Sequence, residues 1–357
     1  MTVGLFSPLQ LGGVEISNRL VVAPMCQYSA LNGAPTEWHH RHLGSLVISG
    51  AGLLMVESTA ISSVGQISQK DLVLETDKQE EGFRRARERL RELSATPVVI
   101  QLSHAGRKGS VHVPWQKSGR NLCSDEGAWP TLSASALPRG EGWQVPGEMT
   151  GQQIETTILD FQASARRAMS SGYEGVEVHM AHGYLLHQFL SPISNKRTDE
   201  YGGNLQNRCR FPLKVAAAVR QVVPRSHILG VRMTGDDWLD GGWTVEDAVY
   251  LARALENLGI DYLCVSSGGI VPITDLKFKP GYQVHLARAI KTAVSVPIRT
   301  AGMITQPGQA DQIVRDASAD MVALGRQLIR EPWFAYRAAS ELGSVMQVPN
   351  QYQRCFL

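Results

Sequence analysis

The sequence lacks the features that mark several classes of protein. No apolar run approaches the about 18 residues that a membrane-spanning helix needs. Lys and Arg (35) nearly balance Asp and Glu (33), and both signs are spread along the chain. Without a basic stripe or an acidic tail, neither a nucleic-acid surface nor a membrane surface is indicated. The five cysteines are odd in number and scattered, which disfavours a disulfide framework. The N-terminus has no signal-peptide pattern, so we expect a cytoplasmic protein.

A GxGxxG motif after the first strand is also missing, which disfavours a doubly wound dinucleotide-binding sheet. Short apolar runs recur between longer amphipathic segments, and such continuous runs are typical of parallel strands covered on both faces. They predict strands at Leu20–Ala23, Gly52–Glu57, Pro97–Leu102, Gly175–His179, Ile228–Met233, Tyr262–Ser266, Val296–Thr300 and Met321–Leu324. The amphipathic segments predict helices at Lys78–Leu93, Ile154–Ser170, Leu205–Val222, Val245–Asn257, Val284–Thr292 and Gln306–Asp316.

This repeated βα pattern predicts an α/β fold, a single (β/α)₈ TIM-barrel domain over residues 1–357 with an N-terminal hairpin. Residues 107–149 are longer than a connection needs and contain Trp115, Trp129 and Trp143. We expect them to form an extended capping loop over the active-site mouth. The charged stretch 191–203 is either a functional loop or a solvated face, and residues 344–357 form a C-terminal tail.

The segment VEVHMAHGYLLHQFL at Val176–Leu190 says most about function. A β-branched run stops at His179, and His182 and Tyr184 follow within a few residues. Two imidazoles can donate hydrogen bonds to an oxyanion, and a phenol beside them can supply a proton. We therefore predict that His179, His182 and Tyr184 form a catalytic cluster at the C-terminal end of a strand.

Glycines and basic residues at other strand ends indicate a phosphorylated ligand. Glycine turns after the seventh and eighth strands, at Gly302 and Gly325–Arg326, form the commonest phosphate site of a TIM barrel. At mid-barrel strand ends, Gln101 could match a pyrimidine edge and Arg232 could offset negative charge on a ring. The spacing alone does not distinguish a flavin from a sugar phosphate.

The histidine pair has a second interpretation, as metal ligands in a TIM-barrel metallohydrolase, or as part of a lyase or isomerase site. A zinc site needs at least one further ligand. We expect Glu177 to point to the opposite face of the strand from His179, which leaves His104 and Asp236 as candidate partners. We expect no metal.

Several long segments, in the right order, resemble the old yellow enzymes, and within them the thermophilic-like bacterial branch of ene-reductases. They include LFSPLQLGGVEISNRLVVAPMCQYSA near the start, QLSHAGRK at Gln101–Lys108, HMAHGYLLHQFLSPISNKRTDEYGGNLQNRCRF at His179–Phe211 and ALGRQLIREPW from Ala323. The resemblance implies a barrel that holds non-covalent FMN and takes electrons from NADPH or NADH. Such an enzyme reduces the activated C=C bond of α,β-unsaturated carbonyl or nitro compounds by hydride transfer from flavin N5.

The resemblance also implies roles for individual residues. His179 and His182 would bind the substrate oxygen, Tyr184 would protonate the α-carbon from the opposite face, and Tyr28 would contact the substrate. Cys26 would touch the flavin and tune its potential. The FMN would be held by Ala23, Pro24, Met25, Cys26, Ala60, Gln101, Arg232, Gly302, Gly325 and Arg326. Lys108 and Trp115 are candidate cap contacts.

The C-terminal sequence Gln351–Arg354 also matches this branch. The resemblance implies that Arg354 reaches the active site of a neighbouring subunit, in a homodimer or a homotetramer built from dimers. Two other flavoprotein interpretations stay open. One is a dienoyl-CoA reductase-like enzyme, which the scattered cysteines disfavour because it needs a cysteine cluster for iron–sulfur ligation. The other is a flavin-binding protein without catalytic activity.

Overall fold

The computed structural model describes residues 3–272 and 278–355. Eight parallel strands form its core, and they close on themselves because β3 pairs with both β13 and β4. The closed barrel confirms the predicted TIM-barrel fold, and each of the eight strands lies where the sequence predicts it. Their bounds are β3 (Leu20–Val22), β4 (Leu53–Ala60), β6 (Val98–Ser103), β9 (Gly175–Met180), β10 (Ile228–Thr234), β11 (Tyr262–Ser266), β12 (Ile298–Thr300) and β13 (Met321–Leu324). The short β5 (Leu72–Val73) pairs with β4.

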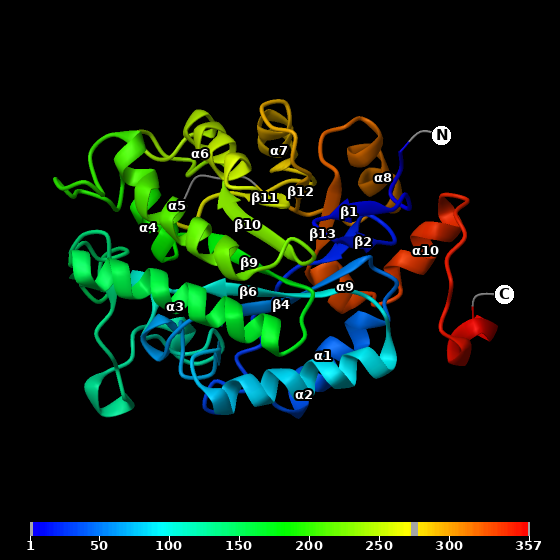
Figure 1. The fold of residues 1–357 in the computed structure, drawn as a ribbon, viewed down its shortest axis with the longest axis horizontal. Helices are drawn as coiled ribbons and strands as arrows, with labels where there is room; N and C mark the ends of the chain where they lie inside the picture. The colour runs from blue at the N-terminus through cyan, green and yellow to red at the C-terminus, as the bar shows by residue number, and fades with distance from the viewer. Residues whose placement is uncertain (1–2, 273–277, 356–357) are drawn as a thin grey trace.

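Helices surround the barrel, as Figure 1 shows for α2 along its lower edge. The six predicted helices are confirmed as α2 (Asp77–Leu93), α3 (Gly151–Ser170), α5 (Leu205–Val222), α6 (Val245–Asn257), α7 (Val284–Lys291) and α8 (Pro307–Arg315). The helical pattern noted after Tyr184 is the short α4 (Leu185–Leu190). Two helices were not predicted, α1 (Glu37–Val47) and α10 (Phe334–Glu341), and the short α9 (Arg326–Arg330) directly follows the glycine turn at Gly325. In α1, three histidines and Gly44 give a weak helical propensity that packing against α2 overrides.

The expected N-terminal hairpin is formed by β1 (Leu9–Leu11) and β2 (Val14–Ile16), which pair antiparallel. Its side chains Leu11 and Ile16 are fully buried and belong to the same cluster as the barrel-interior residues Val21, Leu53 and Ile228. Each buried aliphatic side chain contributes about 1.5–3 kcal/mol of hydrophobic stabilisation. The hairpin therefore closes the N-terminal end of the barrel and leaves the other end open for a site.

Residues 107–149 form a cap built from short elements, namely the 3₁₀ turns η2 (Gly106–Lys108), η3 (Lys117–Gly119) and η4 (Ser124–Glu126) and the short strands β7 (Leu132–Ser133) and β8 (Gly147–Glu148). Arg197, from the charged stretch 191–203, donates hydrogen bonds to the carbonyl oxygens of Ala134 (3.0 Å) and Met149 (2.7 Å). Since Arg197 is buried, this part of the stretch is no solvated face. The Arg197 hydrogen bonds therefore fix the cap to the barrel.

The C-terminal tail lies at the end of the molecule away from the cap loops (Figure 1). Its 3₁₀ segment η5 (Asn350–Cys355) is anchored by Tyr352, whose ring meets that of Trp333 edge-on at 4.8 Å. The tail borders a cavity of about 660 Å³ together with Asn18, Gly50 and Pro97, which precede strands β3, β4 and β6. The tail is therefore at the N-terminal ends of the strands. The last two residues of the expected tail, 356–357, lie outside the described residues.

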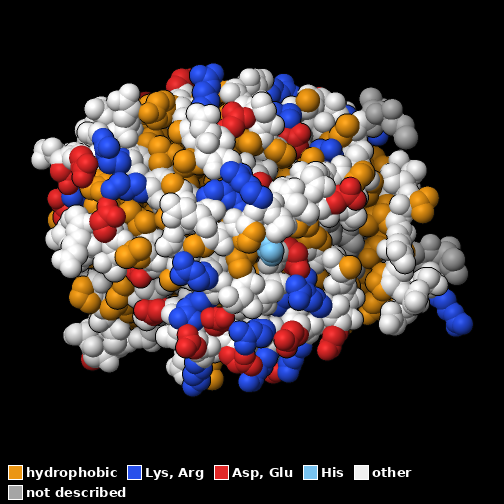
Figure 2. Space-filling view, viewed as in Figure 1, with side chains coloured by type: hydrophobic (Ala, Val, Ile, Leu, Met, Phe, Trp, Pro, Cys, Tyr) orange, Lys and Arg blue, Asp and Glu red, His pale blue; other side chains and the backbone are white. Residues whose placement is uncertain are grey.

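The surface shown in Figure 2 carries Lys and Arg side chains interspersed with Asp and Glu. Along α2 opposite charges pair one helical turn apart, as in Arg84 with Glu80 and Arg85 with Glu81. No helix in the described part of the chain is long and apolar enough to span a membrane.

Candidate active site

A cavity of about 700 Å³ opens at the C-terminal ends of β3 and β10–β13. It is lined by eight residues predicted for the site: Ala23, Pro24, Met25, His182, Arg232, Gly302, Gly325 and Arg326. The other predicted residues, Cys26, Tyr28, Ala60, Gln101, His179 and Tyr184, are not among its lining residues. His179 contacts His182, and Tyr184 contacts His179. Arg354 is exposed, and the tail that carries it borders the N-terminal ends of the strands, so this chain does not bring it to its own cavity.

The loop after β9 holds His182 in a conformation that the neighbouring loop enforces. His182 and Gly183 both have left-handed backbones, with φ of +59° and +72°. A Cβ added to Gly183 would lie 2.1 Å from the carbonyl oxygen of Gly269, so the loops after β9 and β11 touch backbone to backbone. The His182 N–H also donates to Oγ1 of Thr234 at 3.2 Å. The position of the imidazole is therefore fixed from two strands.

The two imidazoles have assignable tautomers. His179 Nδ1 accepts the Ala181 N–H at 3.1 Å, so a neutral His179 carries its proton on Nε2, which lies 3.2 Å from His182 Nδ1. His182 Nε2 lies 2.6 Å from Oγ of Ser266. Burial, with the nearby Arg232, lowers the pKa of both histidines well below the usual value. Both are therefore neutral at pH 7; the His179 Nε2–H faces His182 Nδ1, and the His182 Nε2–H faces Ser266 Oγ, which itself donates to Gln283.

Tyr184 completes the cluster. Its ring meets that of His179 edge-on at 4.9 Å. The Nζ of Lys108 lies 4.7 Å from the centroid of the Tyr184 ring and donates to the His182 carbonyl oxygen at 2.6 Å. Burial raises the pKa of Tyr184 well above its usual value. Burial, followed by repulsion from Arg139 and Arg107, lowers the pKa of Lys108 to about 7.

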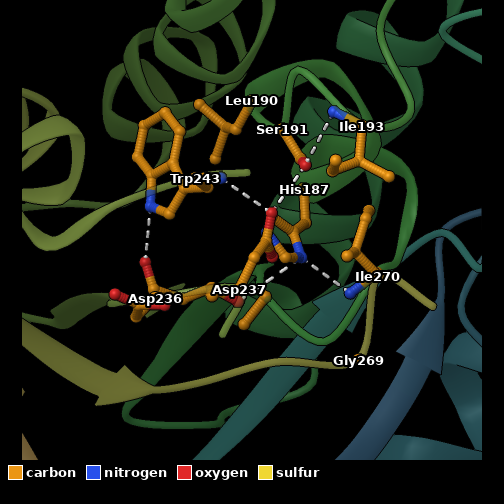
Figure 3. A network of polar contacts seen from close by, with 12 residues as sticks. His187, Leu190, Ser191, Ile193, Asp236, Asp237, Trp243, Gly269 and Ile270 are labelled. Atoms are coloured by element: carbon orange, nitrogen blue, oxygen red, sulfur yellow. Dashed lines mark hydrogen bonds and ion pairs between the residues drawn. The ribbon is translucent and has the colours of Figure 1, made fainter. Parts of the chain in front are cut away.

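A buried pair of side chains, a neutral imidazole against a carboxylate, supports this loop (Figure 3). His187 Nε2, from α4, lies 3.0 Å from Oδ1 of Asp237, and neither side chain is exposed. Oδ2 of Asp237 accepts hydrogen bonds from the Ser191 hydroxyl at 2.6 Å and the Trp243 N–H at 2.9 Å. His187 Nδ1 accepts the Gly183 N–H at 2.8 Å. The pair thus ties the catalytic loop to the segment after β10.

The cavity wall has the groups that a flavin nucleotide requires. The buried Nε of Arg232 has no hydrogen-bond partner among the described residues. Gly302 has φ of +119°, and a Cβ there would lie 2.8 Å from Nε2 of Gln283, so only glycine fits this turn. Arg326 lines the same end of the cavity after Gly325. The unpaired Arg232 Nε, the Arg326 guanidinium and the glycine turns fit a phosphate and an electron-accepting ring.

The loop after β3 places Cys26 and Tyr28 beside two buried carboxyl groups. Burial raises the pKa of the Cys26 thiol, and the Glu57 and Asp71 carboxylates raise it further, so the thiol is neutral. Tyr28 has a left-handed backbone, and its ring meets that of Trp115 in the cap at 5.8 Å. Of the two candidate cap contacts, Lys108 therefore touches the cluster, and Trp115 touches Tyr28.

The prediction for Glu177 was wrong. Residues two apart in a strand share a face, so Glu177 points into the barrel interior on the same side as His179. There its Oε1 accepts a hydrogen bond from Nε2 of Gln101 at 2.7 Å.

Ala60, another predicted site residue, is buried at the end of β4.

The metal interpretation finds no support in the side-chain arrangement. Across residues 3–272 and 278–355, no group of three or more His, Cys, Asp or Glu side chains is placed to hold a metal ion. Of the candidate partners, His104 uses Nδ1 to accept the Gly106 N–H at 3.0 Å, and Asp236 accepts the Trp238 N–H.

Two polar residues that line the cavity, Ser266 and Gln283, had no predicted role. Ser266 bonds His182 and donates to Oε1 of Gln283 at 3.0 Å, and Gln283 donates to the Ala301 carbonyl oxygen at 3.1 Å. Ser266 ends β11, so its strand-end position was the signal available. Gln283 lies after a loop and not at the end of a strand, so its position in the sequence gave no signal.

Comparisons with known proteins agree with this geometry. The NADH:flavin oxidoreductase / NADH oxidase family model matches residues 4–344. An NADPH dehydrogenase of Geobacillus sp. (strain WCH70) is 40% identical over 356 residues, which cover 99% of each chain. Morphinone reductase superposes with a TM-score of 0.79 at 27% identity, over 98% of this chain and 92% of its own. A 2-naphthoyl-CoA reductase superposes with a TM-score of 0.84 at 24% identity, which concerns the fold alone. This chain covers 95% of its own length there but only 52% of that protein.

The family match extends over nearly the whole chain, and it confirms the resemblance drawn from the motifs. The chain belongs to the NADH:flavin oxidoreductase / NADH oxidase family, which includes the old yellow enzymes, and it is an FMN-dependent oxidoreductase that uses a nicotinamide nucleotide.

Proposed function

We propose that this protein is an ene-reductase that reduces the activated C=C bond of α,β-unsaturated carbonyl or nitro compounds. The observation that carries the proposal is the cluster of His179, His182 and Tyr184 at a cavity that Arg232 and Arg326 also line. A site for hydrogen-bonding an oxygen, a proton source and a nucleotide cavity are thereby adjacent.

In this proposal the two histidines hold the substrate oxygen. On substrate binding the His179 Nε2–H turns from His182 Nδ1, and the His182 Nε2–H turns from Ser266 Oγ, to the substrate oxygen. Both hydrogen bonds strengthen as charge develops on that oxygen. Since both imidazoles are neutral, they stabilise the developing charge as donors and do not transfer their own protons. The Ser266 contact holds His182 in place before the substrate binds.

Tyr184 is the proposed acid. Its raised pKa keeps the phenol protonated at pH 7, so a proton is available for the α-carbon. After the transfer the tyrosinate is stabilised by the Lys108 ammonium over its ring. Tyr28 and Trp115 close the substrate side of the pocket.

The FMN would be held by the ten residues Ala23, Pro24, Met25, Cys26, Ala60, Gln101, Arg232, Gly302, Gly325 and Arg326. When bound, FMN supplies the hydride for the β-carbon after NADPH or NADH has reduced it. Arg232 offsets negative charge on the ring, Gly302 and Gly325–Arg326 bind the phosphate, and the neutral Cys26 thiol tunes the potential.

The proposal includes a homodimer, or a tetramer built from dimers, in which Arg354 enters a partner's site. Its support is the position of η5, which is exposed and lies at the end of the barrel away from the chain's own cavity. It also includes a cytoplasmic location, supported by five cysteines that form no disulfide.

An anaerobic spectral titration tests the function. The purified holoenzyme is expected to show a flavin band that bleaches on addition of NADPH and returns with 2-cyclohexenone. A flavin that NADPH reduces but that no activated alkene reoxidises would overturn the ene-reductase proposal. His182→Ala is expected to weaken the binding of phenolic ligands while leaving FMN bound. Loss of FMN from this variant would make His182 a structural residue.

A further inference from the structure

A layer of polar side chains crosses the barrel interior beneath the cavity. Its residues are neighbours in strand register: Gln101 on β6 pairs with Glu177 on β9, Glu177 with Gly230 on β10, and Gly230 with Tyr262 on β11. Gln101, Glu177 and Tyr262 are buried, and hydrophobic side chains of the closed barrel end lie below them. Polar groups in such a place need complete hydrogen bonding.

Glu177 is the centre of this layer. Its Oε1 accepts from Nε2 of Gln101 at 2.7 Å, and its Oε2 accepts from the Tyr262 hydroxyl at 2.7 Å. Oε2 also pairs with the guanidinium of Arg299, and both charged side chains are fully buried. Arg299 Nη1 donates to the Tyr262 oxygen at 3.3 Å. The carboxylate is therefore fixed in charge, position and orientation.

Gly230 makes this arrangement fit. It stands between Glu177 and Tyr262 in register, and a Cβ built on it would lie 2.1 Å from Cζ and 2.5 Å from the hydroxyl oxygen of Tyr262. The missing side chain leaves room for the phenol to cross β10 and reach Glu177. Its φ is not left-handed, so the requirement for glycine here is steric and involves no backbone strain.

The layer determines which way the Gln101 amide faces. A carboxylate only accepts hydrogen bonds, so the NH₂ group of Gln101 must point at Glu177. Its Oε1, which has no partner among the described residues, then faces away from Glu177. We propose that Glu177, held by Tyr262 and Arg299, is a positioning residue that makes Gln101 present its carbonyl oxygen to the N–H of the flavin pyrimidine edge. This inference rests on the proposed FMN site.

Three variants test the layer without touching the cavity wall. In Glu177→Gln the new amide can hydrogen-bond to the Gln101 amide in either of its two orientations. The orientation of Gln101 is then no longer determined. Tyr262→Phe removes one hydrogen bond to Glu177 and keeps both charges, and Gly230→Ala displaces the phenol. Tyr173→Phe is the matched control, because Tyr173 is equally buried but donates to the Phe83 carbonyl oxygen outside the barrel.

The readouts are the dissociation constant of FMN and the NMR signal of its N3–H in holoenzyme reconstituted with ¹⁵N-labelled FMN. Glu177→Gln is expected to weaken FMN binding about tenfold, as for one hydrogen bond to a well-placed acceptor. The N3–H signal should shift toward that of free FMN. Tyr262→Phe and Gly230→Ala should shift it in the same direction by less, and Tyr173→Phe should not change it.

Two outcomes separate this inference from the proposed function. If Gln101→Leu weakens FMN binding but Tyr262→Phe and Gly230→Ala leave the N3–H signal and the affinity unchanged, the positioning role is wrong. This holds even if Glu177→Gln fails to fold. If Gln101→Leu itself leaves FMN binding unchanged, the proposed contact between Gln101 and the flavin is wrong, and the inference fails with it.

Discussion

The substitution Asp237→Asn tests whether the buried pair of Figure 3 supports the catalytic loop. The side chain keeps its shape, but one carboxylate oxygen becomes an NH₂ group. If that group replaces Oδ2, it faces the Ser191 hydroxyl and the Trp243 N–H. If it replaces Oδ1, it faces His187 Nε2, whose proton cannot move because Nδ1 already accepts the Gly183 N–H. Both orientations bring donor against donor in a fully buried site.

The expected cost follows from this conflict. Losing a hydrogen bond to a buried carboxylate and leaving a buried donor without an acceptor costs on the order of 3 kcal/mol, and on this scale the melting temperature should fall by on the order of 10 °C. Burial alone would raise the pKa of Asp237, but His187, Ser191 and the Trp243 N–H lower it overall below its usual value. The stabilisation from Asp237 is therefore fully present above the unfolded-state pKa of about 3.9. It is lost as the pH falls through the lower folded-state pKa, so the difference between variant and wild type should shrink in strong acid.

The assay is thermal unfolding followed by circular dichroism at pH 7, at fixed protein concentration and with FMN in excess. Asp236→Asn is the matched control, since Asp236 is half-buried and outside the pair. The control should melt within a few degrees of wild type. A melting temperature for Asp237→Asn equal to that of Asp236→Asn would refute the reasoning.

Three further substitutions probe the site. Arg326→Gln should weaken FMN binding by about 10- to 100-fold, because a charged hydrogen bond to phosphate is lost, and fluorescence titration of the apoprotein measures this; unchanged affinity would place the phosphate elsewhere. Cys26→Ala should shift the flavin reduction potential without a change in melting temperature, and an unshifted potential would reduce the thiol to a packing role. Arg354→Ala should raise the KM for the alkene without a change in FMN content, whereas a wild-type enzyme that sediments as a monomer would contradict a role in a partner's site.

The barrel was predictable from the sequence because buried parallel strands leave a local mark. Each strand is a short apolar run, and polar residues such as His179 and Arg232 stand at its end. The closeness of His179, His182 and Tyr184 follows from their separation of a few residues. These are local relations, and the structure reproduces them.

The contacts that hold the site together were not predictable, because they join residues far apart in the chain. His187 meets Asp237 across 50 positions of numbering, as α4 and the segment after β10 come together. The contact between Gly230 and Tyr262 depends on the strand register. The wrong prediction for Glu177 did not depend on a distant contact. The two-residue period of a strand already places Glu177 on the same face as His179.

The central claim is that the cluster delivers a proton from the face opposite to the incoming hydride. The most direct test is reduction of 2-methyl-2-cyclohexenone by the holoenzyme in H₂O with NADPH that carries deuterium at the transferred C4 position, with the product analysed by NMR. The account predicts one deuterium at the β-carbon, trans to the hydrogen added at the α-carbon, and slower turnover with Tyr184→Phe. Cis addition, or a mixture of both products from the wild-type enzyme, would contradict it.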